Sequence, residues 1–140
     1  MNKEFKPNTN NLRSAIGKLR QVLNACEAES DPERKEMLKM ASAQAFEFTT
    51  EMSWKTMRKV LIWLGASSSD TDETKMKLFQ KAKEEGLIDD PEKWLEYYRN
   101  RNVSSHNYGQ DVADLAFDYA RKVLPDAESL IQKIDEILNV

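Results

Sequence analysis

The chain has few of the residues that cross-link a fold or interrupt its helices and strands. Its 140 residues include one cysteine, one histidine, four glycines and four prolines. With Cys26 as the single cysteine, no disulfide can form within the chain. No segment approaches the roughly 18 uninterrupted apolar residues of a membrane-spanning helix, and residues 1–7 lack the apolar region of a secretory signal. We therefore expect a cytoplasmic protein without membrane contacts.

The chain also has little excess charge of either sign. The chain has 24 acidic and 21 basic side chains and a net charge of −3, which gives no overall attraction to nucleic acid. Any RNA contact therefore has to be local or shared with a partner. Hydrophobic residues make up 40% of the chain, enough for one packed core at this length. We expect a single helical domain over residues 1–140.

Period-two alternation, which is typical of strands, is missing, and the apolar spacing predicts helices. Residues 12–26 carry one apolar seam, from Leu12 to Cys26. The longest predicted helix, over 32–64, starts at Asp31-Pro32 and ends before Gly65. It carries two apolar stripes, so we expect it to be central and covered on two sides. The stripes are Ala41, Ala45, Phe48 and Met52, and Thr50, Trp54, Met57, Leu61 and Leu64.

Three more helices are predicted in the second half of the chain. Asp70 and Glu73 resemble a capping pair that opens a helix to residue 85, and Asp90-Pro91 starts another with Trp94 on its apolar side. The last helix spans 112–138, with a kink rather than a stop at Pro125. The predicted fold is all-α, an antiparallel four-helix up-and-down bundle with an additional short helix.

The residues that most specifically suggest a function lie in one stretch, Arg101-Asn102-Val103-Ser104-Ser105-His106-Asn107-Tyr108. If the helix that begins at Pro91 continues, Asn102 and His106 lie on its apolar face, where they would form a polar lock between helices. The same groups favour a functional site. His106 can move a proton near neutral pH, and Arg101 suits a phosphate. Together they could hold an RNA phosphodiester and deprotonate a 2′-hydroxyl, with no metal required.

Helix geometry also predicts a dimer. On one helix Arg101 and His106 point about 140° apart, so a single copy cannot easily aim both at one phosphate. Two copies facing each other could, and we predict a homodimer with both residues at its seam. Glu47 and Glu51 either pair with nearby Lys55 and Arg58 along their helix or reach across to orient Arg101. No His or Asp has the spacing to complete a metal site with them.

The spacing Arg-x4-His resembles the motif of HEPN domains, which are small helical bundles. Asn102 and Tyr108 extend it to Arg-Asn-x3-His-x-Tyr, which resembles the HEPN partners of minimal nucleotidyltransferases, called nucleotidyltransferase substrate-binding proteins. Two further segments are similar to that family, and the similarity covers roughly residues 10–138. They are Phe46-Glu47-Phe48-Thr49 with Glu51, Trp54 and Lys55, and Gly86-Leu87-Ile88-Asp89-Asp90 with Trp94.

The resemblance implies roles for single residues. Arg101 and His106 would be the pair of a metal-independent ribonuclease, with Asn102 assisting and no cofactor. Tyr108 would be modified with AMP by a separately encoded minimal nucleotidyltransferase, in a toxin–antitoxin pair. Two alternatives stay open: a non-catalytic subunit that binds nucleotide or substrate, and an interaction protein in which residues 101–106 only lock an interface.

Overall fold

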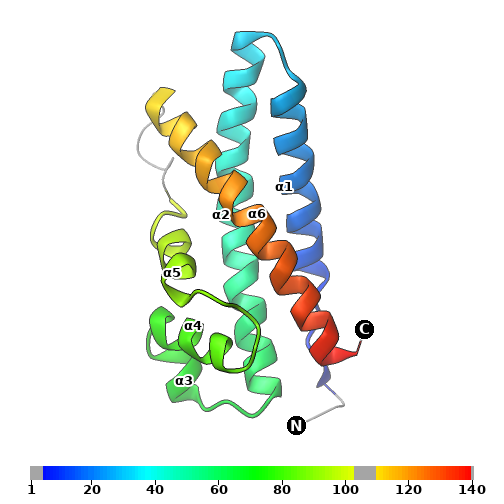
Figure 1. Ribbon diagram of the computed structural model, residues 1–140, viewed down its shortest axis with the longest axis vertical. Helices are drawn as coiled ribbons and strands as arrows, with labels where there is room; N and C mark the ends of the chain where they lie inside the picture. Colours follow the sequence, from blue (N-terminus) through cyan, green and yellow to red (C-terminus); the bar gives the residue numbers. More distant parts are fainter. Residues whose placement is uncertain (1–4, 103–109, 140) are drawn as a thin grey trace.

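The computed structural model describes residues 5–102 and 110–139, and within them all regular structure is helical. The chain runs up α1, down α2, up through short helices and down α6 (Figure 1). This confirms the predicted all-α bundle, with short helices in its third, upward column. The helices are α1 (Asn10–Ala28), α2 (Pro32–Trp63), α3 (Ser68–Asp72), α4 (Lys75–Glu84), α5 (Pro91–Arg99) and α6 (Gln110–Leu138).

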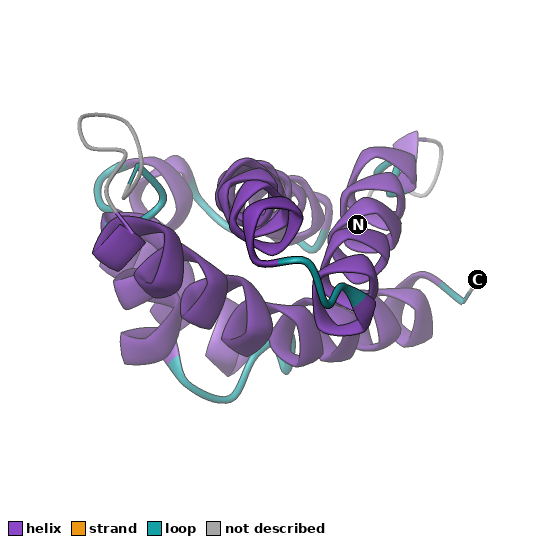
Figure 2. Cartoon of the chain, turned by 90° about the horizontal axis from the view of Figure 1, so that it is seen from above, coloured by secondary structure: helices purple, strands orange, loops and turns teal. Residues whose placement is uncertain are grey.

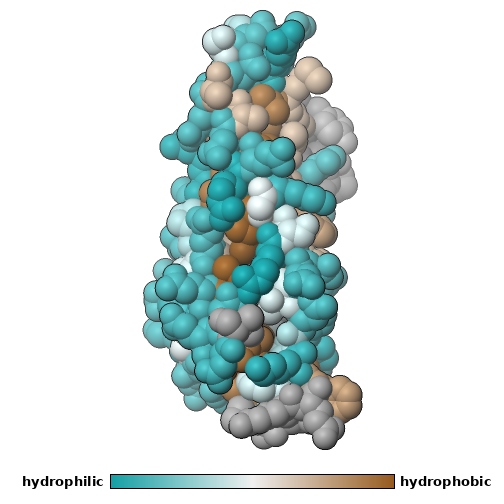
Figure 3. All heavy atoms as spheres, turned by 90° about the vertical axis from the view of Figure 1, so that its right-hand side faces the viewer, coloured by the Kyte–Doolittle hydropathy of each residue, from teal (hydrophilic) through white to brown (hydrophobic). Residues whose placement is uncertain are grey.

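Helix α1 buries the seam that the sequence predicts. Its outer side is tied to α6 by two ion pairs, Arg13 with Asp135 and Arg20 with Glu128. The face that contains α1 and α6 is mostly hydrophilic, with a narrow hydrophobic strip along its length (Figure 3). The strip is narrow because the apolar side chains of α1 turn inward. The buried seam residues are Leu12, Ile16, Leu19, Leu23 and Cys26.

Both ends of α2 are as predicted. The Asp31 side chain accepts a hydrogen bond from the Arg34 amide at 3.0 Å, and Pro32 occupies the first helical position. After the helix, Gly65 has a φ of 98°. That left-handed conformation is unfavourable for a residue with a Cβ atom, and it ends the helix.

One predicted stripe of α2 is only half right, because Ala45 and Met52 pack against the core but its other two residues do not. Ala41 and Phe48 are exposed, with 43% of Phe48 accessible. The buried face carries hydroxyl side chains instead. Ser53 and Thr56 each donate to the carbonyl one turn earlier, at 2.7 and 2.6 Å, so they are buried without an outside partner. A search for apolar side chains misses such a face. The buried polar residues of α2 are Ser42, Thr49, Thr50, Ser53 and Thr56.

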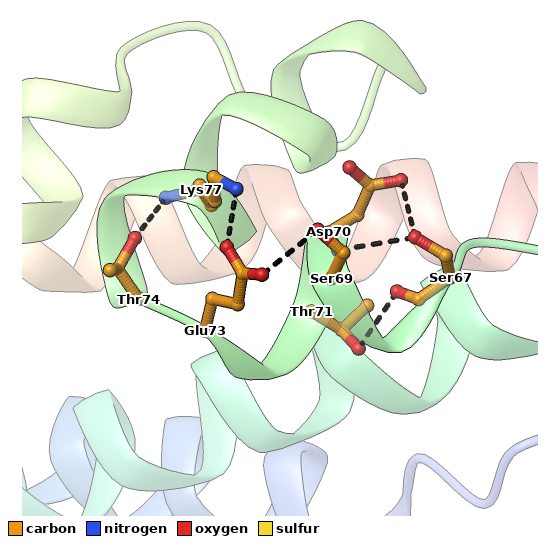
Figure 4. A network of polar contacts seen from close by, with 7 residues as sticks. All are labelled: Ser67, Ser69, Asp70, Thr71, Glu73, Thr74 and Lys77. Atoms are coloured by element: carbon orange, nitrogen blue, oxygen red, sulfur yellow. Dashed lines mark hydrogen bonds and ion pairs between the residues drawn. The ribbon is translucent and has the colours of Figure 1, made fainter.

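The single helix predicted from Asp70 is also wrong, because two helices stand there. The Ser67 hydroxyl accepts from the Asp70 amide at 3.3 Å and caps α3, while Thr74 accepts from the Lys77 amide at 3.1 Å and caps α4 (Figure 4). Glu73 pairs with Lys77 across the break instead of acting as a capping partner for Asp70. α3 ends early because Thr74, the cap of α4, follows so soon after Ser67, the cap of α3.

Helix α5 starts as predicted but ends sooner. Asp90 accepts from the Lys93 amide at 3.2 Å, and the last helical residue is Arg99. The Asn100 side chain donates to the Glu96 carbonyl at 2.8 Å, which satisfies that carbonyl at the end of the helix. The helix therefore does not continue through Asn102, which was the condition for placing Asn102 and His106 on one helix face.

Asn102 lies in a turn and is exposed, so it does not extend an apolar helix face. The rest of that predicted face, His106, lies outside the described residues, as does Tyr108. The dimer was predicted because Arg101 and His106 would lie on one helix. Since α5 ends at Arg99, helix phase no longer supports that prediction.

Helix α6 runs through Pro125 without a stop, as the sequence predicts, and Pro125 faces outward. The helix lies obliquely across α1 and α2 (Figures 1 and 2). Small buried side chains let it approach α2 closely. Along the described ranges, no helix is long and apolar enough to cross a membrane. The small residues that α6 buries are Ala113, Ala116, Ala120 and Ala127.

Candidate functional site

Arg101 lies in the turn after α5 and is held by three contacts. Its Nε atom is 2.8 Å from Glu51 Oε1 on α2. Its Nη1 atom donates to the Tyr98 carbonyl at 2.6 Å, and the guanidinium carbon lies 3.9 Å from the centre of the Tyr98 ring. A side chain held in this way has lost most of its rotamer freedom before any ligand arrives, which lowers the entropy cost of binding.

Glu51 contacts both Lys55 and Arg101, which the sequence offered as alternative partners. Its second oxygen lies 3.8 Å from Lys55 Nζ, while the first contacts Arg101. Arg58 is engaged elsewhere, by both carboxylate oxygens of Asp72 at 2.6 and 3.2 Å. The side chains of Arg101 and Glu51 are 25% and 26% exposed, so their ion pair is more sheltered from solvent than an ordinary surface pair.

Two aromatic rings lie next to Arg101, that of Tyr98 on α5 and that of Trp54 on α2. Tyr98 and Trp54 meet edge to face, with ring centres 6.2 Å apart. Lys75, the first residue of α4, places Nζ 4.0 Å from the centre of the Trp54 ring and 5.3 Å from that of Tyr98. These contacts join α2, α4 and α5 next to Arg101. Sequence reasoning missed Lys75 because it missed the break that starts α4.

Tyr97, the neighbour of Tyr98 in the chain, is only 1% exposed and cannot reach a ligand. Its hydroxyl donates to the carboxylate of Asp126 and to the Lys122 carbonyl, which joins α5 to α6. Burial, assisted by Asp126, raises the pKa of Tyr97 well above its usual value. The phenol therefore stays neutral and donates, so its role is to position α5.

The remaining candidates divide between described and undescribed residues. Glu47 lies half-buried one turn before Glu51, and Asn102 is exposed in the turn beside Arg101. His106 and Tyr108 fall outside the described residues. In the ranges that the structure covers, no three His, Cys, Asp or Glu side chains gather as they would around a metal ion. Burial raises the pKa of the Cys26 thiol, which suits a core residue rather than a nucleophile.

Comparison with known proteins identifies a family and similar proteins. The family described as nucleotidyltransferase substrate binding protein like matches residues 7–136. A probable ribonuclease HepT from Haemophilus influenzae is 30% identical over 92 residues, which are 65% of this chain and 63% of that protein. The chain thus spans less than two thirds of that relative's length.

The solved structure of HI0074, also from Haemophilus influenzae, shares the fold. It is 26% identical to this chain with a TM-score of 0.81, and the match covers 91% of this chain and 98% of HI0074. HI0074 is described as revealing the fold of a substrate binding domain of a nucleotidyltransferase.

Proposed function

This chain belongs to the nucleotidyltransferase substrate binding protein like family, and we propose that it is a HEPN subunit that works with a separately encoded minimal nucleotidyltransferase. In this proposal it carries a metal-independent endoribonuclease site shared across a homodimer. The observation that carries the proposal is the fixed Arg101, which opens the Arg-Asn-x3-His-x-Tyr motif. The similarity to a probable ribonuclease and to a nucleotidyltransferase substrate binding domain supports it.

The proposed reaction needs a bound phosphate and a base. The contacts with Glu51 and Tyr98 use Nε and Nη1 of Arg101, and the guanidinium has further N–H donors for a phosphate oxygen. His106 would take the proton of the 2′-hydroxyl, whose oxygen then attacks phosphorus. The bond to the 5′-oxygen breaks, that oxygen takes up a proton, and a 2′,3′-cyclic phosphate remains. Asn102 would hold a phosphate oxygen.

The partner enzyme would control this site through Tyr108. The partner would transfer AMP from ATP to the Tyr108 oxygen, with release of pyrophosphate and of the hydroxyl proton. The AMP group would place bulk and negative charge two residues from His106, where RNA has to bind. The modified chain would be inactive, and the two proteins would form a toxin–antitoxin pair.

An uncovered apolar face of α2 supports the homodimer. Met37, Ala41 and Phe48 lie four and seven residues apart, on one side of the helix, and Met37 and Phe48 are 69% and 43% exposed. A second copy that covers this face would bury it. We expect Phe48→Glu to convert a dimer into a monomer in sedimentation experiments. Ile62→Glu, at an equally exposed position (44%) near the other end of α2, should leave the dimer intact; dissociation by both variants, or by neither, contradicts this interface.

One cleavage experiment separates the ribonuclease from the alternatives. The purified chain, without its partner, is incubated with RNA in EDTA beside His106→Ala and Arg101→Gln. Cleavage by the parent alone, leaving 2′,3′-cyclic ends, supports the ribonuclease. Equal cleavage by all three contradicts the assigned residues.

The likeness to the HI0074 substrate binding domain favours a second candidate, a non-catalytic subunit that binds nucleotide or presents substrate to the transferase. The absence of cleavage together with saturable nucleotide binding would support it. If the chain neither cleaves RNA nor binds nucleotide, the segment 101–106 is an interface lock.

A further inference from the structure

We propose that a cationic groove on α2, next to Arg101, binds the single-stranded RNA segment that continues from the phosphate held at Arg101. This inference rests on the proposed ribonuclease and names where its substrate runs. The groove has a volume of about 420 Å³ and lies where the chain segment before α1 and the first turn of α1 face α2. Its lining includes Asn8, Asn11, Trp54, Lys55, Arg58 and Lys59.

The groove and the Arg101 site share residues and are therefore continuous. Lys55 and Trp54 line the groove. Lys55 also contacts Glu51, which holds Arg101 through its other oxygen, and Trp54 packs against Tyr98, on which the Arg101 guanidinium lies. A strand whose phosphate meets Arg101 thus reaches the groove without leaving the surface of α2.

The charge of the groove is opposite to that of the chain as a whole. In a chain of net charge −3, the charged lining residues that the structure describes are all cations. Arg58 is neutralised by Asp72, but Lys59 is exposed and pairs with no carboxylate of the described residues. Lys75 adds a further cation over the Trp54 ring. The sequence required any RNA contact to be local or shared with a partner, and this groove offers a local positive potential.

The shape and chemistry of the groove favour a single strand. A groove of this volume holds about one or two nucleotides, whereas proteins that bind double-stranded RNA contact successive grooves of a helix. Cations that follow a backbone beside an aromatic ring are typical of surfaces that bind single strands. Lys75 lies over the Trp54 ring, so a base that stacks there takes the place of the lysine. The side-chain amides of Asn8 and Asn11 can donate to and accept from base edges.

Binding of an uncleavable strand tests the groove directly. Labelled 2′-O-methyl RNA lacks the attacking hydroxyl, so the unmodified chain can be titrated by fluorescence anisotropy at several salt concentrations. We expect Lys59→Gln to lower the affinity about three- to tenfold and to reduce the slope of log K against log salt by about 0.7, the share of one phosphate contact on a single strand.

Arg34→Gln removes the same charge from an exposed position on the same helix, about 37 Å from Lys59 at 1.5 Å per residue. It should match the parent in both affinity and salt slope. Equal melting temperatures of the three proteins exclude a folding defect as the cause of a difference.

The outcomes separate this inference from the proposed function. RNA cleavage by the parent with unchanged binding by Lys59→Gln overturns the groove alone. Weakened binding by Lys59→Gln without cleavage by the parent supports the groove and contradicts the ribonuclease. If AMP alone competes as well as a longer strand, the groove is a mononucleotide pocket and the strand path is wrong, and if no strand binds at all, both proposals fail.

Discussion

The ion pair between Glu51 and Arg101 provides the sharpest test of the site. Glu51→Gln keeps the shape of the side chain and removes its charge, so Arg101 retains a neutral acceptor in place of a carboxylate. The pair spans 2.8 Å between side chains that are about a quarter exposed. Exposed pairs contribute about 0.2–1 kcal/mol, while breaking a buried pair costs about 3–5 kcal/mol. We expect a value near 1 kcal/mol, at the upper end of the range for exposed pairs.

This magnitude predicts two measurable effects. For a chain of this length, a loss of 1 kcal/mol lowers the melting temperature by about 2–5 °C. In the cleavage reaction, the loss of about 1 kcal/mol of positioning corresponds to a decrease of kcat of about fivefold. The change in KM should be smaller, because the phosphate can still pair with the freed guanidinium.

A double-mutant cycle with Arg101→Gln isolates the coupling between the two residues. Urea denaturation of the four proteins should give a coupling energy of about 1 kcal/mol. Glu47→Gln, the same substitution one turn earlier on α2, serves as the control and should change kcat much less. The reasoning fails if the coupling energy is near zero and kcat of Glu51→Gln equals that of the parent, because Arg101 would then act without being positioned by α2.

Three other substitutions test the fold around the site. Tyr97→Phe removes the hydroxyl that joins α5 to Asp126 and should cost about 1–2 kcal/mol in urea denaturation; no loss would mean that this bond is not formed. Gly65→Ala meets no atom within 4 Å but has to adopt a φ of 98°, so calorimetry should show a loss of about 1–2 kcal/mol. The Arg58 guanidinium lowers the pKa of Asp72, so the ionised carboxylate stabilises the folded state. This stabilisation is present above the unfolded pKa of Asp72, near 4, and is lost as the pH falls through its folded pKa. Asp72→Asn should therefore melt earlier than the parent at pH 7 and equally at low pH, and a constant difference would contradict the pair.

Features that depend on local chemistry were predictable from the sequence. The pairs Asp31-Pro32 and Asp90-Pro91 both start helices where predicted, because a side-chain acceptor and a fixed φ act within one turn of the chain. The positive φ of Gly65 and Gly86 likewise ends a helix each time. Neither effect needs a contact with a distant residue.

Features that depend on partners far away in the chain were not predictable. Hydropathy places Phe48 inside and Ser53 outside, but Ser53 is buried because it bonds to its own helix, and Phe48 is left outside by the packing of α1 and α6. The spacing of Leu95, Tyr98, Asn102 and His106 likewise suits one face of a helix that continues past Arg99, whereas the helix stops there. The contact of Glu51 with Arg101 joins two distant segments, so the sequence offered it only as one of two alternatives.

The early end of α5 changes the physical basis for a shared site. Because Arg101 lies in a turn, its direction is set by Glu51 on α2 rather than by helix phase. Phe48 lies three residues before Glu51, and residues at that spacing are neighbours on a helix surface. The exposed apolar face of α2 therefore borders the carboxylate that holds Arg101. A second copy seated on that face would sit beside Arg101, as a cleft shared between two copies requires. If Phe48→Glu yields a folded monomer, this geometry predicts that the monomer keeps the Glu51–Arg101 coupling energy and loses cleavage.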